Sequence, residues 1–235
     1  MEKKNFFRYL FDFIVIVLGI SVSFWFNQVS IKSNDEKDRM RVLSNIEMEV
    51  VELKNYCNDR LTTWNQDIKI YDEFLSDELN IEALSSITTS KSRIEYNLIY
   101  YRDFEPPMNR YNSLINSGDI RYIKSEKIKE LLTRLHTFNL SNIKTTVAYE
   151  KALKEQLIAL MTSAHSEVFI AGNNNYKGLE SYADLLFQAI DDNPRLKANL
   201  LVQMKYFKTR VYLLNQYIYV LEELETELAL VKSPA

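Results

Sequence analysis

The feature that most constrains this chain is an uncharged apolar run that begins close to the N-terminus. From Phe13 to Phe26 the sequence reads FIVIVLGISVSFWF, and no side chain in it carries a charge. As a helix, this run spans about 21 Å at a rise of about 1.5 Å per residue. Extending it back to Phe6 gives about twenty residues, the length that crosses a hydrocarbon layer of about 30 Å. The run therefore predicts a membrane-spanning helix.

Two charged residues, Arg8 and Asp12, fall within that extension. They lie four positions apart on one helical face, so their side chains can pair near the lipid headgroups. Tyr9 and Trp25 would then lie near opposite membrane interfaces, where amphipathic aromatic rings are enriched. In the alternative, Asp12 faces a neighbouring copy of the helix, with Gly19 allowing close approach. We expect Tyr9, Asp12, Gly19 and Trp25 to belong to the membrane anchor.

Two other interpretations of the run remain open. The basic start of the chain and the small-residue triplet SVS at 21–23 suggest a cleaved signal peptide. However, FWF follows that triplet directly, so the apolar run continues past any cleavage point there. A buried helix of a soluble protein is disfavoured because bulky apolar residues cover all sides of the helix. We favour an uncleaved anchor over residues 1–29 and a soluble domain over residues 30–235.

The basic residues that flank the run are nearly balanced, which leaves its orientation weakly specified by charge. They are Lys3, Lys4 and Arg8 before the run, and Lys32, Lys37, Arg39 and Arg41 after it. A short basic tail followed by an apolar run and a large C-terminal part is the usual layout of a signal anchor. We therefore expect a single-pass protein of a bacterial inner membrane, with the N-terminus in the cytoplasm and the helical domain outside.

Composition favours long helices in the rest of the chain. Only four glycines and four prolines occur among 235 residues, so few tight turns are available. A hydrophobic content of 46% suffices for a core. The net charge of -3, with both signs mixed along the chain, provides no basic stripe for nucleic acid. The single cysteine, Cys57, excludes an internal disulfide framework and a multi-cysteine metal site.

Apolar residues at helical spacing predict three long helices. The first covers residues 33–78, and no Pro or Gly separates it from the apolar run. Pro106 and Pro107 suit the first turn of a short helix that is expected to reach about Asn116, with Gly118 as its stop. Ser125 is the expected N-cap of a second long helix that fades near residue 164.

The remaining segments connect these helices. Residues 80–92 are rich in Ser and Thr and predict a connection with at most one short helical turn, and AGNNNYKG at 171–178 predicts a loop. A shorter helix fits residues 179–191, and Pro194 precedes a final helix that reaches about Leu230. The expected fold class is all-α, with an N-terminal transmembrane helix followed by an antiparallel bundle of long helices.

Two blocks of the sequence carry a family resemblance. They are RYLFDFIVIVLGISVSFWFN at 8–27 and RYNSLINSGDIRYIKSEKIKELLTRLHTF at 110–138. Together they resemble an uncharacterised bacterial family of short single-pass membrane proteins, classed as a domain of unknown function. Relatives commonly have glutamate where this chain has Asp12. The resemblance implies an anchor joined to a helical domain, brings no established activity, and singles out a candidate turn motif of Tyr111, Leu114, Ser117 and Gly118.

No catalytic or cofactor motif stands out. His136 and His165 are 29 positions apart on one predicted helix, more than about 40 Å, so they cannot share a metal ion. We expect each at the surface or at a boundary of the core. HExxH, P-loop and GxSxG patterns are absent, and the acidic residues are expected to lie solvated on exposed helical faces. We therefore expect no catalytic, cofactor or metal site, and no enzyme.

Fifteen tyrosines are more than a chain of this length usually carries. Packing between long helices explains them most simply, since aromatic residues at helical spacing usually belong to the core. The alternative is a surface that binds a partner, because tyrosine combines a large contact area with one polar tip.

These features favour a non-enzymatic, membrane-anchored interaction or scaffold protein in an oligomer or envelope complex. Its expected partners are membrane lipid and a second copy or another membrane protein, and nucleic acid is not among them. The alternative is an oligomeric pore, or a membrane-perturbing effector, built from the first helix. A third hypothesis, a receptor that binds a small ligand between its helices, would have to signal through oligomerisation.

Overall fold

The computed structural model describes residues 2–173 and 178–232, and for residues 2–12 it describes the backbone alone. Within these ranges the chain forms helices and no strand, which confirms the all-α prediction. The elements are α1 (Glu2–Phe74), α2 (Ile81–Ile87), α3 (Lys91–Ile99), α4 (Asn109–Ser117), the 3₁₀ helix η1 (Asp119–Tyr122), α5 (Glu126–Thr133), the π-helical segment η2 (Arg134–Asn139), α6 (Leu140–Ala164), α7 (Ser166–Gly172), α8 (Leu179–Asp192) and α9 (Pro194–Lys232).

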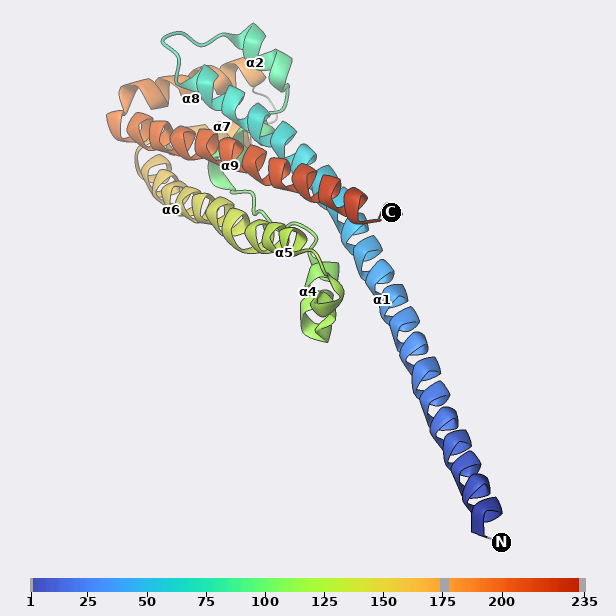
Figure 1. Cartoon of the computed structure of the whole chain (residues 1–235). Coiled ribbons are helices and arrows are strands. Elements are labelled where there is room, and N and C mark those ends of the chain that lie inside the picture. Colours follow the sequence, from blue (N-terminus) through green and yellow to red (C-terminus); the bar gives the residue numbers. More distant parts are fainter. Residues whose placement is uncertain (1, 174–177, 233–235) are drawn as a thin grey trace.

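Helix α1 is a single helix of 73 residues, about 110 Å long. Its N-terminal half projects away from the bundle, and its C-terminal half packs within it (Figure 1). The predicted continuity between the apolar run and the first long helix is therefore confirmed. The helix ends at Phe74, a few residues before the predicted end at 78.

The bundle consists of three long helical stretches with shorter helices around them (Figure 1). Helix α9 lies against both α1 and α6, and α5, η2 and α6 follow one another as a single interrupted helix. Their apolar residues form two cores. The proximal core, nearer the projecting half of α1, joins residues 42–64 of α1 to α5, η2 and the C-terminal half of α9. The distal core joins the end of α1 to α3, α7, α8 and the N-terminal half of α9.

The structure corrects the prediction for residues 80–92. In place of a connection with one turn, the chain forms α2 and then begins α3. Each helix has a side-chain N-cap: Asn80 Oδ1 accepts from the amide of Ala83 at 2.9 Å, and Ser90 Oγ from that of Arg93 at 3.3 Å. The residues that looked like loop formers are therefore capping residues, which satisfy amides that a helix start leaves unpaired.

The predicted helix end at the turn motif and the predicted cap after it are correct, but α4 begins at Asn109, so Pro106 and Pro107 precede the helix and do not form its first turn. Helix α4 ends at Ser117, and Gly118 adopts the left-handed conformation with φ of 73° while its amide donates to the carbonyl of Ile115 at 3.2 Å. Ser125 then caps α5, its hydroxyl oxygen accepting from the amide of Ile128 at 3.3 Å. A Cβ atom at Gly118 would meet no neighbouring atom within 4 Å. The backbone conformation alone therefore requires glycine there.

Replacing Gly118 with alanine should lower the free energy of unfolding by about 1 kcal/mol, because a Cβ strains the left-handed conformation. The matched variant is Gly118→Asn, which fills at least as much space but tolerates this conformation better. Thermal unfolding of both variants in mild detergent measures the difference. Equal destabilisation by Ala and Asn would show that backbone strain is not the cause.

Candidate functional site

The most unusual surface of the protein is the projecting part of α1. Its large apolar side chains between Phe13 and Ile31 are each 42% to 66% exposed. The apolar window has a mean hydropathy of 1.9, and none of it is buried against the rest of the chain. This result contradicts the hypothesis of a buried core helix. The helix is long and apolar enough to cross a membrane, a property that signal sequences share.

The candidate anchor residues are only partly described. Apart from the backbone of its own helical turns, no described part of the chain would come within 4 Å of a Cβ atom at Gly19, and the Ser23 hydroxyl donates to the Gly19 carbonyl at 2.8 Å. Trp25 is exposed and lies edge-on to Phe26. Thus Gly19 leaves a flat, open place on the helix. The side chains of Tyr9 and Asp12, with the predicted pairing of Asp12 to Arg8, lie outside the described residues.

The turn motif fastens α4 to α1. Leu114 is buried in the proximal core. The backbone amide of Tyr111 donates to Glu49 Oε2 on α1 at 2.8 Å, and the Ser117 hydroxyl donates to the Leu114 carbonyl at 3.3 Å. Together with Gly118, these residues hold the edge of the bundle against the helix that leads to the apolar segment.

His136 is buried, so its expected placement at the surface or a boundary is wrong. Its ring stacks on Tyr111 with 3.8 Å between ring centroids, and its Nε2 lies 3.6 Å from Glu49 Oε1. The residue belongs to η2, where a π-helical turn replaces the 3.6-residue period used for the prediction. Burial lowers the pKa of His136 to about 4, and burial also raises the pKa of Glu49. His165, by contrast, lies partly buried between α6 and α7.

Stability should fall between pH 6.5 and pH 4 because the folded protein resists protonation of His136. In that window the unfolded chain binds a proton that the folded chain does not, so the free energy of unfolding drops as pH falls. From the pKa of about 4 against an ordinary 6.5, the loss is at most about 3 kcal/mol. Glu49 opposes the trend, since its raised pKa favours proton uptake by the folded state.

Thermal unfolding of the wild type and His136→Phe at pH 7 and pH 4.5 measures this effect. Phenylalanine can stack on Tyr111 but cannot be protonated, so the variant should lose less stability on acidification. An identical pH dependence in both proteins would rule out His136 as its source.

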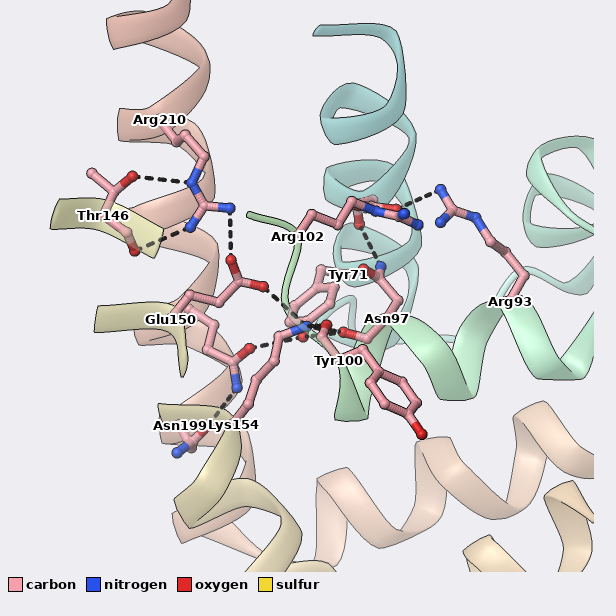
Figure 2. A network of polar contacts seen from close by, with 12 residues as sticks. Tyr71, Arg93, Asn97, Tyr100, Arg102, Thr146, Glu150, Lys154, Asn199 and Arg210 are labelled. Atoms are coloured by element: carbon pink, nitrogen blue, oxygen red, sulfur yellow. Dashed lines mark hydrogen bonds and ion pairs between the residues drawn. The ribbon is translucent and has the colours of Figure 1, made fainter. Parts of the chain in front are cut away.

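The second candidate functional site is a network of buried polar side chains in the middle of the bundle (Figure 2). Glu150 on α6 lies at its centre: its Oε1 is 3.0 Å from Lys154 Nζ and its Oε2 is 2.6 Å from Arg210 Nη1. All three side chains are at least 97% buried. Arg210 also donates to the Thr146 hydroxyl at 3.0 Å and to the Thr146 carbonyl at 3.1 Å. A carboxylate thus stands between two cations on neighbouring helices.

The network continues into α1 and α3. Lys154 donates to the backbone carbonyls of Asn97 and Tyr100, where the chain leaves α3. The Tyr71 hydroxyl is 3.2 Å from the Asn97 carbonyl and 2.9 Å from Gln203 Oε1 on α9. These bonds place a polar layer between the proximal and distal cores, and they connect all three long helices to α3.

Asp67 on α1 closes the layer on the side of α3. Its Oδ1 lies 2.5 Å from Arg93 Nη2 and its Oδ2 lies 3.1 Å from Arg102 Nε. Burial raises the pKa of Asp67, and the positive charges of Arg102 and Lys154 counteract this shift only in part. Burial likewise lowers the pKa of Lys154, although Glu150 opposes that change.

The centre of the layer is closed off from solvent by the surrounding helices. Glu150, Lys154 and Arg210 bind one another and line none of the surface clefts described for this chain. A buried polar layer of this kind fixes the register of helices, because any slip would leave buried charges unpaired. The expectation that the acidic residues all lie on exposed faces is therefore wrong for Glu49, Asp67 and Glu150.

The paired questions of metal binding and thiol reactivity concern the His, Cys, Asp and Glu side chains of the described residues. No three His, Cys, Asp or Glu residues there are grouped so that they could hold a metal ion. Cys57 is fully buried in the proximal core, and burial raises the pKa of its thiol to about 12. The thiol is therefore a packing group that reagents in water do not reach.

The tyrosines divide between core and surface. Tyr71, Tyr182 and Tyr217 are buried, as expected for packing between helices. Tyr212 and Tyr219 are exposed on α9. With two exposed leucines, they form a stripe along one face of that helix, because the spacings of 11, 7 and 11 residues each bring the helix back to nearly the same direction. This α9 stripe is Leu201, Tyr212, Tyr219 and Leu230.

Comparison of the chain with known protein families, with curated proteins and with solved structures finds no match. The family resemblance of the two sequence blocks therefore stays a prediction.

Proposed function

We propose that this chain is a non-enzymatic, single-pass membrane protein whose helical bundle serves as an interaction or scaffold module. The observation that carries this proposal is the uncovered apolar segment at 13–31. It belongs to the same helix that forms one wall of the bundle. Exposing so much apolar surface to water is unfavourable, and lipid removes that penalty.

The continuity of α1 bears on what such a protein can do. From residue 20 to Phe74 the helix contains neither Gly nor Pro, the residues at which helices usually kink. The bundle is therefore held at a fixed distance and angle from the membrane, which suits a protein that presents a surface to others. The α9 stripe is the proposed contact surface, since tyrosine and leucine provide large apolar contact areas.

We place the anchor in a bacterial inner membrane with the N-terminus in the cytoplasm, following the signal-anchor layout. Digestion of intact spheroplasts with protease tests the orientation. The proposal expects the bundle to be degraded while the membrane is intact. Protection of the bundle would place it in the cytoplasm.

Photo-crosslinking in intact cells tests the interaction role. A photoreactive amino acid at Tyr212 or Tyr219 should give a defined adduct. Its mass would show whether the partner is a second copy or another membrane protein. The same amino acid at Glu155, an exposed position on α6, is the control. If positions 212 and 219 give no adduct beyond that of the control, the stripe is not a contact surface.

A second candidate function, an oligomeric pore, is favoured by the open surface at Gly19. Small residues let membrane helices pack closely, and Asp12 is the polar group that such a pore would use. The mass of the detergent-solubilised protein and the leakage of reconstituted vesicles test it. A strict monomer, or equal leakage for the wild type and Asp12→Asn, would contradict the pore.

A further inference from the structure

The edge of the bundle next to the apolar segment is built by α4, η1 and the residues that follow them (Figure 1). Lys124 Nζ lies 3.5 Å from Glu36 Oε2 on α1. Glu36 lies on one face of α1 with Lys32, and Lys32 is three positions beyond the anchor expected over residues 1–29, about 5 Å along the helix. Lipid headgroups extend roughly 5 to 8 Å beyond the hydrocarbon on each side. A protein whose membrane segment ends near residue 29 therefore holds the Lys32 end of this edge at the level of the headgroups.

An open cleft of about 630 Å³ lies at this edge, between α1 and η1. Four basic and two acidic side chains line it together with one tyrosine, so its formal charge is positive. We call it the juxtamembrane cleft. Its lining residues are Lys32, Asp35, Glu36, Arg39, Arg121, Tyr122 and Lys124.

The charges within the cleft are unevenly paired. Glu36 forms ion pairs with both Arg39 and Lys124. Lys32 forms no ion pair with any side chain in the described part of the chain. The Arg121 side chain is exposed, lies over the Tyr122 ring at 5.0 Å and donates to the Tyr122 hydroxyl at 3.2 Å. Asp35 and Asp119 attract it only through space. Two cations of the cleft thus retain donors for an incoming anion.

We propose that the juxtamembrane cleft binds the phosphate group of an anionic phospholipid. A guanidinium can donate two parallel hydrogen bonds to a phosphate, and a lysine beside it adds a point charge. Basic groups next to a membrane helix attract anionic lipid, and tyrosine is enriched at that depth. The proposal rests on the membrane insertion of α1 put forward above.

The phosphate of such a lipid would contact both walls of the cleft at once. Lys32 belongs to α1, whereas Arg121 and Lys124 belong to the edge held by the turn motif. A phosphate between them would bridge α1 and the edge formed by η1 and the residues after it. In this proposal the turn motif supports the site, because the motif holds Arg121 and Lys124 close to α1.

Native mass spectrometry of the full-length protein in detergent tests the proposal with two lipids of identical acyl chains. We expect the wild type to retain phosphatidylglycerol over phosphatidylcholine by at least about tenfold. The triple variant Lys32→Gln/Arg121→Gln/Lys124→Gln should retain both lipids equally. The control is Arg195→Gln/Lys205→Gln/Lys208→Gln, which removes as many exposed charges from the distal half of α9 and should keep the preference.

Other outcomes separate the possibilities. Glycerol phosphate should not displace the lipid, and displacement at equal concentration would show a site for free phosphate groups instead. An unchanged preference in the cleft variant would overturn the proposal. If the wild-type protein resists alkaline extraction from membranes but shows no lipid preference, the lipid site is overturned and the proposed anchor is retained. If alkaline carbonate releases the wild-type protein from the membrane, the proposed anchor itself is overturned.

Discussion

Replacing Glu150 with glutamine should lower the free energy of unfolding by about 3 to 5 kcal/mol, the usual result of breaking a buried ion pair. The variant keeps the shape of the side chain but leaves Lys154 and Arg210 as neighbouring buried cations without their shared carboxylate. Neither can move to water, since each side chain is at least 98% buried. The loss should therefore be far greater than for a surface charge.

Chemical denaturation of the full-length protein in mild detergent measures this change. Near-ultraviolet circular dichroism suits it, because Trp64 lies under the Arg210 guanidinium at 5.1 Å and reports the packing of the layer. The matched control is Glu155→Gln, an identical substitution at an exposed position five residues further along α6, which should change stability by about 0.5 kcal/mol or less. Similar losses for the two variants would mean that the layer contributes little.

Placing two aspartates in the apolar segment should remove the protein from the membrane. Each charge at the centre of a membrane helix opposes insertion by about 2.5 to 3.5 kcal/mol. In Val17→Asp/Ile20→Asp the two act together on one face of the helix. We expect the wild type in the carbonate-resistant membrane pellet and the variant in the soluble or degraded fraction.

The same helix provides a control for this experiment. Met48 and Val51 have the same spacing, belong to α1 and are exposed to a similar degree, but they lie within the bundle. Met48→Asp/Val51→Asp should therefore stay in the membrane pellet. Equal retention of all three proteins would show that the apolar segment is not the anchor.

Much of the fold follows from local signals in the sequence. Pro194 begins α9, Gly118 ends α4 and Ser125 caps α5, each as predicted. The continuity of α1 was predictable because no residue between the apolar run and the bundle breaks a helix. These helix boundaries depend on the backbone preferences of single residues, and residue identity can be read directly from the sequence.

The interior of the bundle was not predictable in the same way. Glu150 and Lys154, four positions apart, look like an ordinary surface ion pair, and only the packing of the neighbouring helices buries them. One signal was available: Arg210 lies between Phe207 and Leu214 on the apolar stripe of α9, where a charge requires a buried partner. His136 was misplaced because η2 departs from the regular helical period.

The membrane segment itself can be tested by cysteine labelling, because the only native thiol, Cys57, is buried and unreactive. In this experiment, variants with a single added cysteine at Leu18, Val22, Met40 or Met48 are treated with a membrane-impermeant maleimide in open membrane fragments. In the protein alone, Leu18 and Val22 are 57% and 50% exposed, more than Met40 and Met48 at 37% and 44%. A water-soluble protein would therefore label at all four positions.

In membranes we expect the opposite ranking. Cysteines at 40 and 48 should react, and those at 18 and 22 should react only after the membrane is dissolved and the protein denatured, because lipid covers them. Labelling at 18 and 22 as rapid as at 48 in intact membrane fragments would contradict the membrane anchor.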